Sequence, residues 1–306
     1  MADAAADHLA VRAPAPPWFQ WALSRPRESR TVAVEGCPIH YLLWPAEPTA
    51  AKARGLLFVH GGGAHANWWS FIAPYFTRDF RVAALDLSGM GDSGRRSSYS
   101  SEIRAQEMRT VMADAALGEK PFVIGHSFGG FMTMKFGSVY GEEIGGAVIV
   151  DSPIRSPEAE ARDPHLRPPM SKTKRVYESF DAALARFRLM PEQPCENQFI
   201  VEYIGRHSLM QVAGGWTWKF DSDAMGSRRF GEPFREYLQA VRCRAALIFG
   251  EKSKLVSRDT ASYMSSLMGP EAPIVEVPEA QHHVMLDQPL AFVAALRMQL
   301  ENWTRS

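Results

Sequence analysis

The sequence has no excess of charge of either sign. Its 34 lysine and arginine residues balance 34 aspartate and glutamate residues in a chain of 306, so the formal net charge at pH 7 is zero. A surface that binds nucleic acid normally brings a basic excess, and no long block of like charge occurs here. We therefore expect no nucleic-acid partner.

Cysteine is also scarce. The three cysteines, Cys37, Cys195 and Cys243, are far apart, odd in number and form no C-x-x-C pair. This spacing fits reduced thiols in a cytoplasm better than a disulfide framework or a zinc site. The nine histidines include no H-E-x-x-H or similarly spaced ligand set, so we expect no metal.

Long hydrophobic runs are missing as well. No apolar segment is long enough to span a bilayer. The N-terminal stretch MADAAADHLAVRAPAPPWF has early acidic residues and prolines, which is typical of neither a signal peptide nor a membrane anchor. We expect a soluble cytoplasmic protein without membrane insertion and with a large buried core.

The sequence does contain a series of short apolar runs. Segments 31–35 and 38–44 predict a hairpin at a sheet edge, joined by a glycine turn. Further strands are expected at 55–60, 81–87, 121–126, 146–151, 245–250 and 273–278. Runs that are apolar on both faces suit a parallel sheet covered by helices, and helical patterns occur at 101–117 and 289–303. The chain should therefore form an α/β fold that binds its ligand at the carboxyl ends of the strands.

The alternation of strands and helices stops between about residues 151 and 241. A bare loop of this length would be exceptional in a compact domain, so we expect a mostly helical insertion over the active edge of the sheet. Its aromatic residues and methionines include Phe180, Phe187, Met190, Tyr203, Met210, Trp216, Trp218 and Phe220. The predicted organisation is a core in two parts, 1–153 (with an N-terminal extension over 1–30) and 241–306, and a cap over 154–240.

The stretch FVIGHSFGG at 122–130 places Ser127 among glycines, between an expected strand and an apolar helical pattern. In that context G-x-S-x-G predicts a nucleophile elbow, a sharp turn that leaves no room for β-carbons beside the serine and exposes its oxygen. The amide of Phe128, at the start of the helix, can donate to a developing oxyanion. The alternative interpretation is a plain helix N-cap serine.

A serine nucleophile needs a base that is itself oriented by an acid. His282 and His283 adjoin in PEAQHHVMLDQPL (278–290), and their spacing leaves open which of them faces the sheet edge. The loop HGGGAHANWW (60–69) follows another strand and is a natural source of a second oxyanion amide, although it also fits a simple βα turn.

A rival motif occurs at 89–94, where GMGDSG fits G-x-G-x-x-G after a strand. The RRSSYS that follows opens no apolar-periodic helix, and Asp114, about twenty residues on, lies inside a helical pattern rather than at a strand end. We therefore expect neither nicotinamide nor flavin. Ser-His-acid chemistry needs no cofactor.

Together these motifs resemble the α/β-hydrolase superfamily from about residue 30 to the C-terminus, and the insertion resembles its variable cap. HGGGAHANWW is similar to the oxyanion loop of that family, LDLSGMGDSG to the loop after its next strand, GHSFGG to its elbow and AQHHVMLDQP to its catalytic-histidine loop. The resemblance implies His282 rather than His283 as the base. It also implies Gly62 as an oxyanion amide, with Gly63 as a near alternative.

The expected chemistry is hydrolysis through an acyl-enzyme formed on Ser127. A carboxylic ester is the favoured substrate bond, followed by a lactone or an activated amide. The composition of the insertion suggests an apolar acyl or aryl group, with Trp216 and Trp218 as candidate substrate contacts. Such side chains also commonly form a cap's own core. Carbon-carbon bond hydrolysis or lyase chemistry, and ligand reception without catalysis, are the alternatives on the same fold.

The acid of the triad departs from the family pattern. The superfamily usually carries an aspartate just after the penultimate strand, where this chain has Gly250-Glu251-Lys252-Ser253-Lys254. Asp151 is the first candidate, because it ends the strand that follows the nucleophile's helix, and certain haloalkane dehalogenases resemble this arrangement. Glu251 is the runner-up. A structural turn residue is the alternative interpretation of Asp151.

Overall fold

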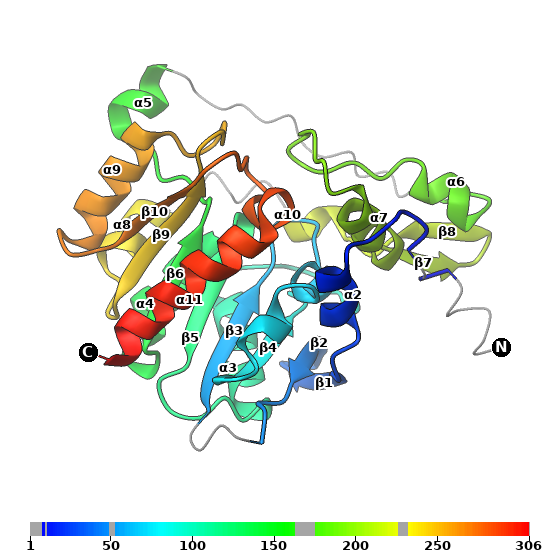
Figure 1. Cartoon of the computed structure of the whole chain (residues 1–306), viewed down its shortest axis with the longest axis horizontal. Coiled ribbons are helices and arrows are strands. Elements are labelled where there is room, and N and C mark those ends of the chain that lie inside the picture. Colours follow the sequence, from blue (N-terminus) through cyan, green and yellow to red (C-terminus); the bar gives the residue numbers. More distant parts are fainter. Residues whose placement is uncertain (1–7, 10, 49–52, 163–174, 226–231, 306) are drawn as a thin grey trace.

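The centre of the molecule is an eight-stranded sheet with the order β1-β2-β4-β3-β5-β6-β9-β10 (Figure 1). The structure is a computed structural model that describes residues 8–9, 11–48, 53–162, 175–225 and 232–305. The strands of this sheet are β1 (Glu28–Val34), β2 (Cys37–Trp44), β3 (Arg54–Val59), β4 (Phe80–Leu85), β5 (Phe122–His126), β6 (Gly146–Val150), β9 (Ala245–Gly250) and β10 (Ile274–Val277). β2 is antiparallel to both β1 and β4, and all other neighbouring pairs are parallel. The predicted mostly parallel α/β sheet is confirmed, with strand ends shifted by up to three residues.

Helices cover both faces of this sheet, and others belong to the insertion between β6 and β9 (Figure 1). The described helices are α2 (Pro17–Leu23), α3 (Ser101–Asp114), α4 (Phe128–Tyr140), α5 (Pro157–Arg162), α6 (Phe180–Leu184), α7 (Gln198–His207), α8 (Phe234–Gln239), α9 (Arg258–Met268), α10 (Val284–Asp287) and α11 (Pro289–Arg305). Along β3, Leu56 and Phe58 join the core cluster that includes α2 and α11. Leu57 and Val59 join the cluster that includes α3, α4 and α9. Because successive side chains of a strand point to opposite faces, a strand buried on both sides must be apolar throughout.

The insertion between β6 and β9 contains helices and a small hairpin. Its described elements are α5, α6, α7, the antiparallel pair β7 (Leu209–Val212) and β8 (Gly215–Trp218), a 3₁₀ turn at Ser222–Met225 and α8. The hairpin was not expected from the sequence, because its strands are four residues long and largely exposed or half-buried. α8 packs against α4 of the core, with the rings of Phe234 and Phe131 4.8 Å apart.

Among the residues that the structure describes, no helix is both long enough and apolar enough to cross a membrane.

Candidate active site

The turn from β5 into α4 carries Ser127 in a backbone conformation that few side chains adopt. Its φ is 52° and its ψ is −116°, and its N–H donates to Val150 O over 2.9 Å. A β-carbon on Gly125 would lie 2.3 Å from the carbonyl oxygen of Gly129, and one on Gly129 would lie 2.4 Å from that of Val59. The glycines thus allow α4 to begin directly against the strands, which is the sharp turn that the motif predicts.

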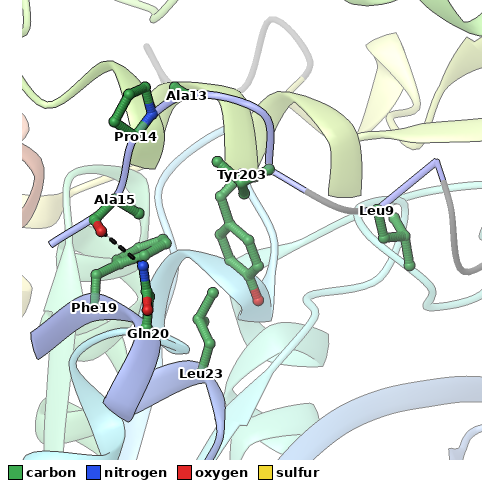
Figure 2. A pocket seen from close by; sticks show the side chains of 9 residues that line it. Leu9, Ala13, Pro14, Ala15, Phe19, Gln20, Leu23 and Tyr203 are labelled. Carbon is green, nitrogen blue, oxygen red and sulfur yellow. Dashed lines mark hydrogen bonds between the residues drawn. The ribbon is translucent and has the colours of Figure 1, made fainter. Parts of the chain in front are cut away.

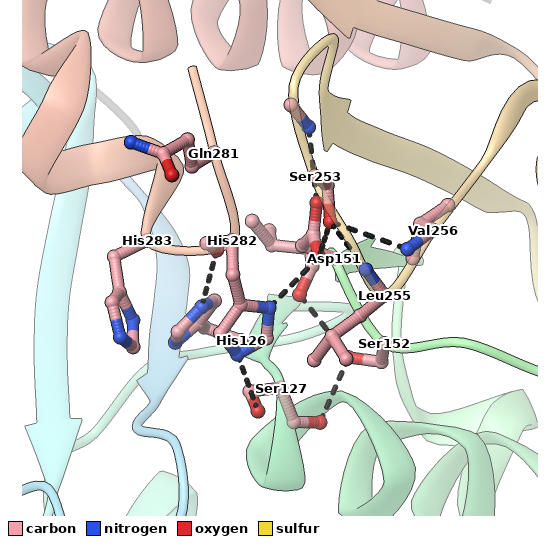
Figure 3. Close-up of polar contacts among 12 residues, drawn as sticks. His126, Ser127, Asp151, Ser152, Ser253, Leu255, Val256, Gln281, His282 and His283 are labelled. Atoms are coloured by element: carbon pink, nitrogen blue, oxygen red, sulfur yellow. Dashed lines mark hydrogen bonds and ion pairs between the residues drawn. The ribbon is translucent and has the colours of Figure 1, made fainter. Parts of the chain in front are cut away.

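His282, in the loop between β10 and α10, connects Ser127 to Asp151. Its Nε2 lies 3.0 Å from Ser127 Oγ and its Nδ1 lies 2.8 Å from Asp151 Oδ1 (Figure 3). His282 and Asp151 are buried, whereas Ser127 is half-buried. The neighbouring His283 contacts the indole of Trp68 instead, at a ring-centroid distance of 5.3 Å. Of the two candidate bases, the structure therefore brings His282 to the serine.

Asp151 follows β6 and accepts hydrogen bonds from the loop after β9. Ser253 Oγ donates to its Oδ1 over 2.7 Å, and the N–H of Gly250 donates to its Oδ2 over 3.0 Å. Burial raises the pKa of Asp151 to about 7, while these two donors act in the opposite direction. Ser253 lies in the stretch after the penultimate strand where the superfamily that the sequence resembles usually carries an aspartate. In this chain that loop supplies a hydroxyl that supports a carboxylate from the neighbouring strand.

Glu251, the other candidate acid, lies elsewhere. Its side chain is exposed, and its Oε2 accepts the N–H of Glu279 over 2.9 Å. The structure thus brings Asp151, and not Glu251, into contact with His282.

The glycine-rich loop after β3 lies against the elbow. The N–H of Leu87 donates to Nε2 of His60 over 3.0 Å, so His60 carries its proton on Nδ1 and donates it to the carbonyl oxygen of Gly61 over 2.7 Å. A β-carbon on Gly61 would lie 3.4 Å from Cβ of Ser127. The next residue is Gly62, one of the two predicted oxyanion amides. The other, Phe128, is the first residue of α4, where an N–H lacks an acceptor within its own helix.

Asp86 stabilises this loop by accepting hydrogen bonds from its backbone, a role that the sequence did not predict. Its Oδ1 accepts the N–H of Ala66 over 2.5 Å, and its Oδ2 accepts the N–H of Asp92 over 2.8 Å. Burial acts to raise the pKa of Asp86, but the hydrogen bond and charge of His40 lower it to about 2. The only sequence signal was a carboxylate at the end of a strand, within LDLSGMGDSG.

The insertion between β6 and β9 lies against the glycine-rich loop at two places. Phe220, which follows β8, forms a backbone bridge with Met90, and its ring lies 3.9 Å from the place a β-carbon on Gly63 would take. Ser208, which follows α7, hydrogen-bonds His65 over 2.9 Å. Nothing in the sequence singled out Phe220 from the other aromatic residues of the insertion. Its place beside the glycine-rich loop is known only from the structure.

Trp216 and Trp218 pack within the insertion. Trp216 stacks edge-on against Phe180 at 5.0 Å, and Trp218 lies 6.1 Å from Tyr177 and from Phe187, as distances between ring centroids. Both belong to a small apolar cluster separate from the two main cores. Their contact with substrate stays a prediction.

A surface hollow of about 490 Å³ lies between the N-terminal segment and α7 (Figure 2). It is lined by Leu9, Val11, Ala13, Pro14, Ala15, Phe19, Gln20, Leu23 and Tyr203. The lining contains no member of the Ser127 site and no nucleophile–base pair.

The comparisons with known proteins agree with the fold. The model of the alpha/beta hydrolase family matches residues 56–296, so the chain belongs to that family and is an enzyme of it. It is 24% identical to esterase Rv0045c of Mycobacterium tuberculosis over 261 residues, 82% of this chain and 84% of that protein. It is 25% identical to pimeloyl-[acyl-carrier protein] methyl ester esterase of Klebsiella pneumoniae, over 80% of this chain and 94% of that one. The solved structure of E-2-(acetamidomethylene)succinate hydrolase is similar in fold, with a TM-score of 0.74, 22% identity and coverage of 92% of this chain and 100% of the other.

Proposed function

We propose that this protein is a serine hydrolase that cleaves a carboxylic ester or lactone through an acyl-enzyme. The observation that carries the proposal is the continuous chain of contacts from Asp151 through His282 to Ser127, with distances of 2.8 Å and 3.0 Å. Two similar proteins that carry esterase names, from Mycobacterium tuberculosis and Klebsiella pneumoniae, support the choice of an ester bond.

The mechanism follows from the geometry around Ser127. In its ionised form Asp151 can only accept, so it holds the proton of His282 on Nδ1 and leaves the Nε2 lone pair facing Ser127 Oγ. Ser127 attacks the substrate carbonyl as its proton moves to His282. The amides of Phe128 and Gly62 stabilise the resulting oxyanion, with Gly63 as the near alternative to Gly62.

Collapse of the tetrahedral intermediate releases the alcohol. His282 donates its Nε2 proton to the leaving oxygen, which restores the neutral imidazole and leaves an acyl group on Ser127. Water then repeats the sequence: His282 removes its proton, the hydroxide oxygen attacks the acyl carbon, and Ser127 leaves with the returned proton. The products are a carboxylic acid and an alcohol, and no cofactor takes part.

An apolar acyl or aryl group fits the cap side of the site. Phe220 is half-buried and lies beside the glycine-rich loop, where it can contact a group bound next to Ser127. An aromatic ring in that position favours apolar over charged groups by burying their surface. We propose the substrate to be a small molecule, and a cytoplasmic location stays a prediction from the unpaired cysteines.

Labelling with a fluorophosphonate probe and hydrolysis of p-nitrophenyl acetate test this function. Wild type should label and turn over, and Ser127→Ala, with an unchanged circular dichroism spectrum, should do neither. Turnover that is equal in the two proteins would mean a ligand receptor. Labelling of the wild type without hydrolysis of any ester or lactone in a graded panel would favour carbon-carbon bond cleavage instead.

A further inference from the structure

The peptide unit that follows the proposed base is hydrogen-bonded at both of its ends. Its carbonyl oxygen, on His282, lies 3.0 Å from Nε2 of His126. Its N–H, on His283, donates to Oε1 of Gln193 over 3.1 Å. One partner comes from the end of β5 and the other from the insertion between β6 and β9. Two distant parts of the chain therefore hold the same peptide plane, which adjoins the imidazole that contacts Ser127.

His126 is held as a neutral hydrogen-bond donor. Its side chain is 1% exposed, and burial, together with the nearby His282, lowers its pKa to about 3. Because Nε2 faces a carbonyl oxygen, the single ring proton is on Nε2. Figure 3 shows this contact, and the centroids of the two imidazole rings are 4.8 Å apart. His126 thus keeps donating to this carbonyl over the whole pH range in which a neutral His282 can act as a base.

The side-chain amide of Gln193 joins the same peptide to a carboxylate. Because its Oε1 accepts the N–H of His283, its NH₂ group points the other way, where Nε2 lies 2.9 Å from Oδ2 and 3.0 Å from Oδ1 of Asp287. Asp287 Oδ2 also accepts the N–H of Gln281 over 2.8 Å. An acceptor faces one end of the amide and a donor faces the other, so its orientation is fixed. The backbone is therefore held on both sides of His282.

We propose that His126 and Gln193 are positioning residues for His282, and that they act by fixing the peptide that follows it. This peptide and the imidazole are attached to the same α-carbon, so fixing the peptide leaves the ring only its own side-chain torsions. Those torsions bring Nδ1 to 2.8 Å from Asp151 Oδ1 and Nε2 to 3.0 Å from Ser127 Oγ. This positioning role rests on the proposed function, because it requires His282 to be the base.

The role can be separated from simple stabilisation of the loop. A misplacement of about 1 Å at a reacting group can lower a rate about a hundredfold. Acylation and deacylation use the same base, so a displaced His282 slows both steps together and lowers kcat with little change in KM. Hydrogen bonds that only stabilise the loop would lower the melting temperature and leave kcat of the folded protein unchanged.

The first test compares His126→Gln with His126→Leu in the hydrolysis of p-nitrophenyl acetate, well below the melting temperature of either variant. A glutamine places an NH₂ group close to the position of the imidazole Nε2, whereas leucine fills the space without a donor. His126→Leu should have a kcat at least about tenfold below that of His126→Gln, with a similar KM. An equal kcat in the two folded variants would overturn the role of His126.

The second test pairs Gln193→Met with Gln281→Met, the same substitution made at the same contact between insertion and loop. The side chain of Gln281 donates to the carbonyl oxygen of Pro194 over 3.1 Å instead of binding the peptide after His282. Gln193→Met should lower kcat at least about tenfold, whereas Gln281→Met should change it less than about twofold. An equal loss in both, or a lower melting temperature of Gln193→Met with an unchanged kcat, would overturn the role of Gln193.

Hydrogen exchange of the His283 amide, followed by NMR, tests the contact with Gln193 without any substrate. This amide should exchange at least about tenfold faster in Gln193→Met than in wild type or Gln281→Met, because loss of its acceptor favours local opening. Equal exchange in the three proteins would overturn the contact. A wild type that neither hydrolyses an ester nor reacts with a fluorophosphonate would overturn the proposed function, while the exchange result stands.

Discussion

Replacing Asp151 with asparagine should abolish base catalysis by His282 while leaving the fold intact. Every described partner of the Asp151 carboxylate is a donor: His282 Nδ1 and Ser253 Oγ at Oδ1, and the N–H of Gly250 at Oδ2. An asparagine that keeps its oxygen toward Gly250 turns its NH₂ to His282. The imidazole must then carry its proton on Nε2 and face Ser127 with a donor.

The size of the effect follows from this reversal of the tautomer. Loss of the correctly oriented base costs about ten-thousand-fold in kcat in Ser-His-Asp enzymes, which corresponds to about 5.5 kcal/mol of transition-state stabilisation. We expect a loss of that order in the hydrolysis of p-nitrophenyl acetate. In wild type, activity should fall as the pH drops below about 7, because burial raises the pKa of Asp151 to that value and its protonation removes the acceptor for His282.

The stability of the wild type should depend on pH in the opposite direction to its activity. The folded-state pKa of Asp151 is raised from 3.8 to about 7, so between these values the folded protein binds more protons than the unfolded chain. Wild type therefore loses stability as the pH rises through this window, and the asparagine variant has no such term. Between pH 4 and pH 7 the wild type should therefore lose up to about 4 kcal/mol of unfolding free energy relative to Asp151→Asn. Urea denaturation of both proteins at a series of pH values would measure this difference.

Glu251→Gln is the matched control. Its carboxylate is exposed and contacts the backbone of Glu279, so turnover should change less than about twofold. A folded Asp151→Asn protein that loses less than tenfold, or a greater loss in Glu251→Gln, would refute the assignment of the acid.

Three further outcomes are expected. Ser127→Gly should melt higher than Ser127→Ala, because glycine relieves a conformation with φ of 52° that costs about 1–3 kcal/mol; equal melting temperatures would show that the elbow stores no strain. Asp151→Asn combined with Ser253→Asp should recover at least about tenfold of the activity lost in the single variant, since Ser253 Oγ lies 2.7 Å from Asp151 Oδ1; no recovery would mean that this loop cannot supply the acid. Phe220→Ala should change the preference among p-nitrophenyl esters of graded chain length. Trp216→Ala separates the two interpretations of this tryptophan: a lower melting temperature with an unaltered preference would show that its ring serves only the packing of the insertion. A changed preference in Trp216→Ala alone would return that tryptophan to the substrate pocket.

The sheet was predictable because burial on both faces leaves a direct mark on the sequence. β5 and β6 are continuous apolar runs, since helices cover both sides of each strand. The hairpin of β7 and β8 left no such mark. Its strands are four residues long and largely exposed or half-buried. β8 also forms a backbone bridge from Trp216 to Tyr177, which lies far away in the sequence.

Chain order by itself determined which groups are candidates for the site: a serine between glycines after a strand, a glycine-rich loop after another, and a histidine pair before the last helix. It placed Asp151 ahead of Glu251 but could not exclude Glu251, because each follows a strand and β6 and β9 are neighbours in the sheet. Only the tertiary structure turned one carboxylate inward to His282 and left the other in solvent. In the same way, His126 and His283 are more than 150 positions apart, and only the parallel sheet brings their rings within 5.5 Å, because it gathers distant strand ends at one edge.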